Sequence, residues 1–191
     1  ARAMTNRWRT FQPVDRRTVA GTPHGRIRLG YLSGDFHAHA TCVLMAEVFE
    51  HHDKNRFEVF AYSHGPDERS IMRTRVESAI EHFIDTRSMS SLDMARRIAD
   101  DQIDVLIDLK GHTSGNRLEV LAYRPAPVQA TFLAFPGTTG AFFMDYIIGD
   151  AVVTPLTHAA HYSEKIAQMP VCYQPNDRKR PLPRPMQRAD V

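Results

Sequence analysis

The sequence has little of what defines several protein classes. It has 2 cysteines, Cys42 and Cys172, and the absence of a CxxC pair excludes the common cysteine-based zinc sites. No stretch approaches the roughly 18 consecutive apolar residues of a membrane-spanning helix, and the N-terminal residues lack the apolar run of a secretory signal. These absences predict a protein of the reducing cytoplasm that contacts no membrane, with Cys42 as a buried thiol in a helix.

Charge is distributed unevenly along the chain, although the net charge is only +2. Residues 1–28 contain seven arginines and one acidic residue, and residues 176–191 contain five basic and two acidic residues. The segment between them is therefore acidic, whereas a nucleic-acid-binding domain usually carries its basic patch on the folded body. We expect no nucleic-acid partner.

Apolar patterns divide the chain into alternating strands and helices. Residues 1–25 form a predicted connecting segment that ends in a Gly/Pro turn, residues 26–173 form one domain, and residues 174–191 form a proline-rich linker; no internal repeat is visible. Such alternation predicts an α/β fold with an open, mostly parallel sheet and flanking helices. The predicted strands lie near residues 26–34, 56–65, 82–86, 103–111, 128–137, 145–150 and 165–170, and the helices near 41–53, 67–83, 90–102 and 118–125.

The first candidate turn follows the first predicted strand and has the sequence SGDFHAHAT, residues 33–41. Asp35, His37 and His39 precede a helix for which Thr41 is the predicted N-cap. The positive end of a helix favours a neutral imidazole, and a neutral imidazole can take the proton of an attacking alcohol. The same Asp-x-His-x-His spacing also suits Zn²⁺, so a metal-dependent hydrolase is an alternative interpretation.

Two further strand ends are rich in glycine and polar residues. The segment DLKGHTSGNR contains His112 and Arg117, and the segment LAFPGTTGAFFMD contains Pro136, Gly137 and two threonines. The second of these segments matches neither a phosphate-binding P-loop nor a dinucleotide fingerprint. Because parallel strands deliver their carboxyl ends to one edge of a sheet, we expect these two turns and the first one to form a single cleft.

Longer segments of the sequence resemble a known enzyme family. RIRLGYLSGDFHAHAT, RFEVFAYS, RPAPVQATFLAFPGTTGAFFMDYIIGD and HYSEKIAQMP are similar to the N-terminal catalytic half of the O-GlcNAc transferase and SPINDLY-like glycosyltransferases, in particular a bacterial member. The resemblance covers about residues 26–173 in unbroken order. It implies one Rossmann-like half of a GT-B glycosyltransferase. The implied activity is an inverting, metal-independent transfer of N-acetylglucosamine from UDP-GlcNAc to Ser or Thr hydroxyls of proteins, with no cofactor.

The resemblance also implies roles for individual residues. His39 matches the histidine proposed as the catalytic base, and Asp35 matches an aspartate able to orient that imidazole or share its proton. Ala40 and Ala134 depart from the proline and glycine often found in the family, which leaves the sugar pocket open in detail. The implied donor- or acceptor-binding residues are Thr41, His112, Arg117, Leu133, Ala134, Pro136 and Gly137.

The family pattern extends beyond this sequence. It implies a C-terminal Rossmann-like half that carries most UDP contacts, tetratricopeptide repeats upstream, and protein acceptors as partners; neither the second half nor the repeats are found here. Three alternatives stay open: fucose from GDP-fucose as the sugar donor, the hydrolase built on Asp35, His37 and His39, and a Rossmann-like docking domain without catalytic activity.

Overall fold

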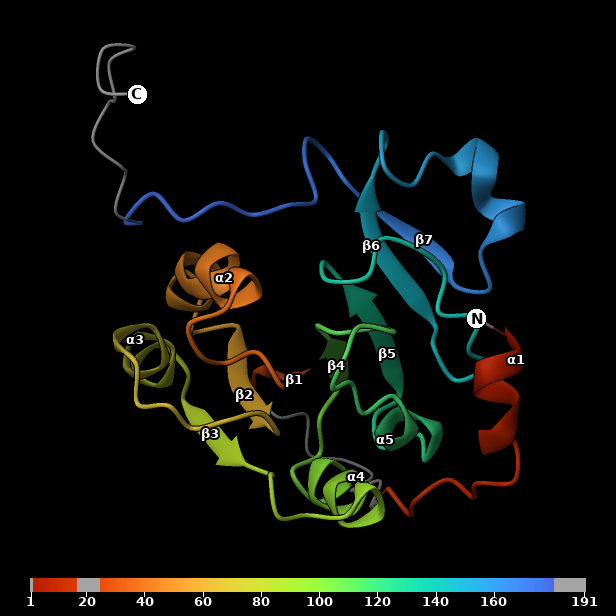
Figure 1. Ribbon diagram of the computed structural model, residues 1–191, viewed down its shortest axis with the longest axis horizontal. Helices are drawn as coiled ribbons and strands as arrows, with labels where there is room; N and C mark the ends of the chain where they lie inside the picture. The colour runs from red at the N-terminus through yellow and green to blue at the C-terminus, as the bar shows by residue number, and fades with distance from the viewer. Residues whose placement is uncertain (1, 17–24, 181–191) are drawn as a thin grey trace, which may run out of the picture.

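The computed structural model describes residues 2–16 and 25–180, and these form a seven-stranded sheet flanked by helices (Figure 1). Every pair of neighbouring strands is parallel, and the strand order is β3-β2-β1-β4-β5-β6-β7. The predicted parallel α/β sheet is confirmed. The strands are β1 (Ile27–Ser33), β2 (Phe57–Ser63), β3 (His82–Asp85), β4 (Val105–Asp108), β5 (Val128–Phe132), β6 (Tyr146–Asp150) and β7 (Lys165–Met169).

The helices begin where polar side chains can bond free backbone N–H groups. Ser70 and Ser90 cap α3 and α4, and each hydroxyl accepts a bond from the N–H three residues on. The helices are α1 (Arg2–Thr5), α2 (Ala40–Glu50), α3 (Ile71–Ala79), α4 (Ser91–Asp100) and α5 (Glu119–Ala122), with 3-10 turns η1 (Asn6–Trp8) and η2 (Leu156–His161). No helix among the described residues is long and apolar enough to cross a membrane.

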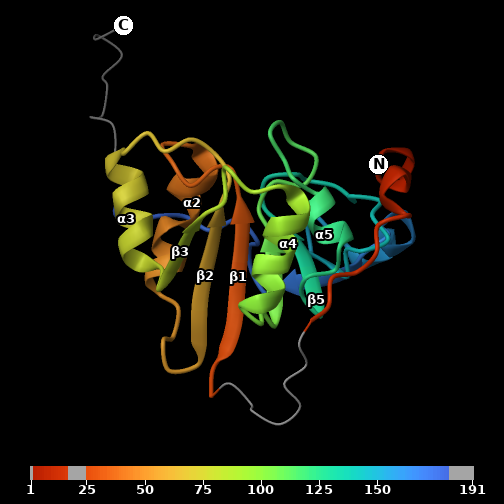
Figure 2. The ribbon, with the colours of Figure 1, turned by 90° about the horizontal axis from the view of Figure 1, so that it is seen from below.

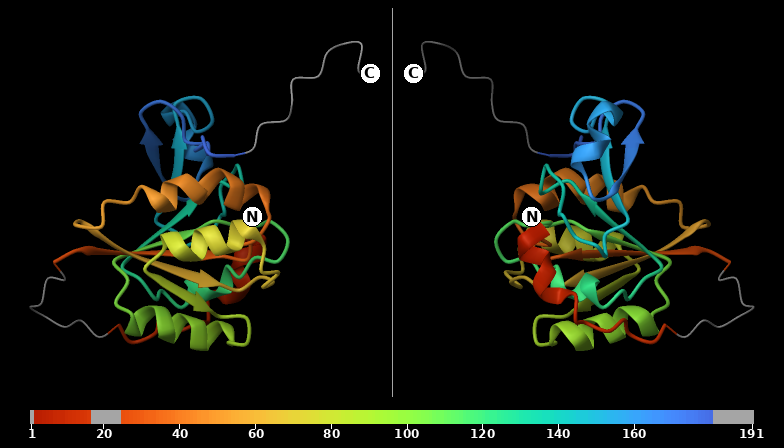
Figure 3. Two further views of the ribbon diagram at one scale, coloured as in Figure 1. Left: turned by 90° about the vertical axis from the view of Figure 1, so that its left-hand side faces the viewer. Right: turned by 90° about the vertical axis from the view of Figure 1, so that its right-hand side faces the viewer.

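Helices cover both faces of the sheet, with α2 and α3 on one side and α4 and α5 on the other (Figures 2 and 3). Period-2 alternation in β1 sends Leu29 and Tyr31 into the core beneath α2 and α3, whereas Leu32 belongs to the core beneath α4 and α5. Both faces of the central strands are therefore buried, as near-continuous apolar runs such as residues 103–109 predict.

The N-terminal segment contributes to the second of these cores. Trp8 is 6% exposed and packs its ring 5.9 Å from that of Phe143, and the hydroxyl of Thr5 donates to the carbonyl of Gly140. The prediction of a connecting segment over residues 1–25 missed this packing, because a single tryptophan produces no apolar period. The predicted turn at residues 21–25 lies almost wholly outside the described residues.

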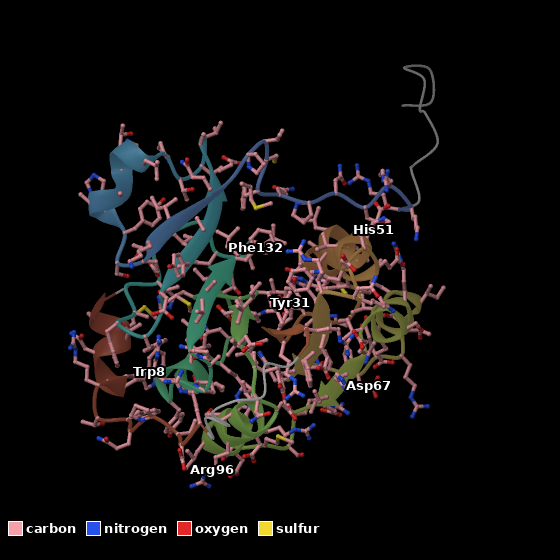
Figure 4. All side chains as sticks on the ribbon, turned by 180° about the vertical axis from the view of Figure 1, so that it is seen from behind. Trp8, Tyr31, His51, Asp67, Arg96 and Phe132 are labelled. Carbon is pink, nitrogen blue, oxygen red and sulfur yellow. The ribbon has the colours of Figure 1, made fainter. Side chains whose placement is uncertain are left out.

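The chain leaves β7 and crosses to the other end of the sheet. Residues 171–180, which we call the strap, run past β6 and over α2 (Figure 1). His51, at the end of α2, lies where the strap passes (Figure 4), with its Nε2 3.4 Å from the guanidinium of Arg178. The strap contains no helix or strand. The predicted linker begins within it at residue 174, and residues 181–191 lie outside the described part.

Candidate active site

The turn after β1 places His39 at the start of α2. His39 has an extended backbone (φ −129°, ψ 152°), and its Nδ1 accepts a bond from the backbone N–H of Thr41 at 3.2 Å. His39 is therefore the N-cap, and the prediction that Thr41 caps this helix is wrong. The reason is that an imidazole nitrogen at this position can accept a free backbone N–H of the first helical turn, as a capping hydroxyl would. The His39 side chain is 43% exposed, so it is accessible from solvent.

Asp35 lies beneath His39 and is almost fully enclosed. Its Oδ1 accepts a 2.6 Å bond from Nζ of Lys110, and both side chains are less than 8% exposed. Its Oδ2 lies 3.6 Å from Nδ1 of His39 and has no hydrogen-bond partner among the described residues. Lys110 was not among the predicted site residues, although a lysine two positions after the apolar strand β4 was a usable signal.

The turn after β4 holds Lys110 through its backbone. Asp108, 1% exposed, accepts bonds from the N–H groups of Lys110 at 3.3 Å and Gly111 at 2.6 Å. Burial raises the pKa of Asp108 to about 7. Gly111 has φ +54°, and a Cβ there would lie 2.4 Å from Cβ of Phe135. Only glycine allows this turn to pack so closely against the turn after β5.

The three predicted turns converge on one cleft of about 420 Å³. Their strands β1, β4 and β5 are adjacent in the sheet, and the chain reverses its direction of travel across the sheet between β1 and β4. Open parallel sheets bind ligands at such a switch point. Tyr31 of β1 and Phe132 of β5 mark this central region in Figure 4. The cleft is lined by Asp35, His39, Ala40, Thr41, Leu44, Lys110, Thr113, Ser114, Leu133, Ala134, Tyr173 and Gln174.

Four predicted binding residues do not line this cleft. Nε2 of His112 lies 2.7 Å from the carbonyl of Thr139, and the ring packs edge-on against Phe135. The guanidinium of Arg117 is turned away and bonds the carbonyl of Met89 and the hydroxyl of Ser91 at the start of α4. Neither His112 nor Arg117 lines this cleft, and the expectation that they face donor or acceptor stays a prediction.

The other two residues belong to the turn after β5. Pro136 lines a small neighbouring pocket that it shares with Leu133, and Gly137 lines neither space. The hydroxyls of Thr138 and Thr139 both bond the carboxylate of Glu164, which is 5% exposed and also accepts the N–H of Thr139. The glycine- and threonine-rich turn is thus tied to Glu164 rather than offering its hydroxyls to the cleft.

His37, in the same turn as His39, lies beside a different carboxylate. Nδ1 of His37 lies 3.6 Å from Glu68, away from the Asp35–His39 contact. Within the described ranges, no three His, Cys, Asp or Glu side chains come together in a way that could hold a metal ion. No geometry at Asp35, His37 and His39 supports the hydrolase alternative. Burial lowers the pKa of His64 to about 4, so its ring is neutral at pH 7.

Comparisons with known proteins agree with this geometry. The profile of glycosyl transferase family 41 matches residues 10–191. The probable UDP-N-acetylglucosamine–peptide N-acetylglucosaminyltransferase SEC of Arabidopsis thaliana is 44% identical over 154 residues, covering 81% of this chain and 16% of that protein. The UDP-N-acetylglucosamine–peptide N-acetylglucosaminyltransferase of Caenorhabditis elegans is 43% identical over 146 residues, covering 76% of this chain and 13% of that protein.

A solved structure has the same fold. A mutant of the Thermobaculum terrenum O-GlcNAc transferase superposes with a TM-score of 0.76 at 33% identity, over 85% of this chain and 30% of that one. This match confirms the predicted Rossmann-like half of a GT-B glycosyltransferase. The chain spans less than a fifth of the two curated relatives, so it corresponds to one part of a longer protein in each. The chain belongs to glycosyl transferase family 41.

Proposed function

We propose that this chain is the acceptor-side half of a UDP-GlcNAc:protein O-linked N-acetylglucosaminyltransferase. The observation that carries the proposal is the cleft itself, in which an exposed imidazole stands at the mouth and an enclosed carboxylate lies behind it. The names of the Arabidopsis and Caenorhabditis relatives describe transfer of N-acetylglucosamine to peptides.

In the proposed reaction, a Ser or Thr hydroxyl of an acceptor protein attacks the anomeric carbon of the donor sugar. The new C–O bond forms as the bond to the diphosphate breaks, and UDP leaves with the electron pair. His39 takes the hydroxyl proton, and the walls formed by Thr41, Leu133 and Ala134 hold the sugar. Orientation in the cleft and the positioned base each lower the barrier, the base by roughly 10²–10⁴-fold in rate.

We further propose that the complete enzyme adds a C-terminal Rossmann-like half that supplies most UDP contacts, and tetratricopeptide repeats that bring protein acceptors. The supporting fact is the length of the relatives, of which this chain matches only 13% and 16%. The strap, which leaves the cleft wall at Tyr173 and Gln174, is the connection toward that second half.

The test uses the complete polypeptide that contains this chain. It is incubated with an acceptor protein and either UDP-GlcNAc or GDP-fucose, and the acceptor is analysed by intact mass spectrometry. We expect addition of one or more N-acetylhexosamines with UDP-GlcNAc. Addition of deoxyhexose from GDP-fucose alone would identify the other sugar, and no addition from either donor would favour the docking domain.

A further inference from the structure

We propose that Lys110 is a positioning residue that acts on His39 through Asp35, an inference that rests on the transferase function proposed above. The three side chains form a continuous chain of contacts across two neighbouring strand ends. Nζ of Lys110 bonds Oδ1 of Asp35 at 2.6 Å, and Oδ2 of the same carboxylate lies 3.6 Å from Nδ1 of His39.

The contacts of Nδ1 of His39 present a conflict that the reaction must resolve. In this structure Nδ1 accepts the N–H of Thr41, which requires a lone pair on Nδ1. A neutral imidazole in that state carries its proton on Nε2, so Nε2 cannot accept the proton of an acceptor hydroxyl. For Nε2 to act as the base, the proton must sit on Nδ1 and needs an acceptor there.

Asp35 is the group able to receive that proton contact. Its Oδ2 is buried, lacks a hydrogen-bond partner among the described residues, and is the carboxylate oxygen next to Nδ1 of His39. A movement of a few tenths of an ångström would bring 3.6 Å within hydrogen-bond range. A carboxylate that accepts the Nδ1–H holds the imidazole in the tautomer whose Nε2 faces the substrate.

Lys110 makes this arrangement possible by holding the other oxygen. An ionised carboxylate enclosed to 5% exposure is costly unless a positive charge accompanies it. The ammonium supplies that positive charge and fixes the carboxylate plane, so that Oδ2 is directed at His39. Lys110 is itself fixed because Asp108 binds the backbone N–H groups of Lys110 and Gly111. The end of β4 and the turn that follows it therefore fix the position of the Lys110 ammonium.

The test measures kcat and KM for UDP-GlcNAc in the complete enzyme with Lys110→Met, Asp35→Asn and the double variant. We expect Lys110→Met to lower kcat by roughly 10²-fold, within the range of a positioned base, with KM unchanged. Because Lys110 acts through Asp35, the double variant should be no slower than Asp35→Asn alone. Lys110→Arg, which keeps the charge, should retain more kcat than Lys110→Met.

Two controls separate positioning from folding. Lys165→Met removes an exposed lysine at the start of β7 and should leave kcat unchanged. The double variant removes both buried charges, so it should unfold at a higher temperature than Lys110→Met and can be assayed even if the single variant folds poorly.

Several results would overturn the inference: an unchanged kcat in Lys110→Met, a rise in KM in place of a fall in kcat, equal losses with Met and Arg, or losses that multiply in the double variant. Any of these, with a wild-type enzyme that transfers sugar, leaves the proposed function standing. A wild-type enzyme that transfers no sugar contradicts the proposed function itself.

Discussion

The ion pairs near the two ends of α2 differ in their exposure to solvent. At its N-terminus, Asp35 and Lys110 are enclosed, with side chains 6% and 7% exposed. At its C-terminus, the Glu47 side chain is 8% exposed, but its partner, Arg178 of the strap, is 79% exposed. Enclosing both charged groups of a pair carries a desolvation cost, whereas a pair whose cation stays in solvent carries less of that cost and is weakened more by salt.

Groups near the two ends of α2 should respond differently to acid. His64 lies within the electrostatic influence of Asp35 and Lys110. Burial lowers the pKa of His64 to about 4 from an ordinary value of 6.5, so the unfolded chain takes up a proton in this range and the folded chain does not. Stability is therefore lost as pH falls from 6.5 toward 4, by roughly 3 kcal/mol, since a pKa difference of one corresponds to about 1.4 kcal/mol. At the strap, hydrogen bonds from Arg178 lower the pKa of Glu47 to about 2, so its contribution is lost only below about pH 4.5.

His64→Leu tests the loss of stability between pH 6.5 and 4. We expect the variant to lose less stability than wild type between pH 6.5 and 4, as measured by urea denaturation at a series of pH values. The raised pKa of Asp108 gives an opposite slope, with stability falling as pH rises from 3.8 to 7, and this slope is common to both proteins. The control is His158→Leu, at an exposed histidine of η2. Parallel curves for His64→Leu and wild type would refute the prediction.

The strap should matter for stability and not for the chemistry. Arg75 of α3 bonds both oxygens of Asp177 and both oxygens of Glu50. The Asp177 side chain is 0% exposed, so Arg75→Met should lower the free energy of unfolding by about 1–3 kcal/mol, the cost of an enclosed polar group left without its partner.

The Arg75→Met enzyme should keep its catalytic rate. Tyr173, where the strap borders the cleft, is held separately by a bond from its N–H to Asp150, so kcat of the Arg75→Met enzyme should equal that of wild type. A large fall in kcat with unchanged stability would show that the two ends of α2 are not independent.

The smallest effect is expected at the Glu47–Arg178 pair, in which the arginine is exposed. Arg178→Ala removes the guanidinium bonds to Glu47, and the loss of stability should shrink in about 1 M NaCl, because salt screens exposed charges. Thermal denaturation at low and high salt measures this difference. A loss that is independent of salt would mean that packing of the arginine stem, rather than its charge, holds the strap.

The strands and the parallel sheet could be predicted because alternating apolar residues and the alternation of strands with helices are visible in the sequence. The cleft could be predicted because parallel strands bring their carboxyl ends to one edge of the sheet. The sequence did not identify the partners of individual side chains. Lys110 meets Asp35 across 75 residues, and Glu164 meets Thr139 across 25. Arg117 was predicted as a binding residue, yet its guanidinium bonds Met89 and Ser91 at the start of α4. Such long-range contacts are decided by packing that no local pattern encodes.

The family resemblance supplied His39 and Asp35, and the structure adds how they are held. A histidine as N-cap was not predicted, because hydroxyl and carboxylate side chains are the common caps. This capping contact determines which nitrogen of His39 is free, and hence whether the residue can act as a base.

The proposed function requires that the cleft between β1, β4 and β5 performs the transfer, with His39 at its mouth. The measurement that tests it most directly is kcat of the complete enzyme with His39→Ala, compared with His158→Ala at an exposed histidine of η2. The account predicts a fall of roughly 10²–10⁴-fold for His39→Ala and wild-type turnover for His158→Ala. Near-normal kcat in His39→Ala would contradict the account.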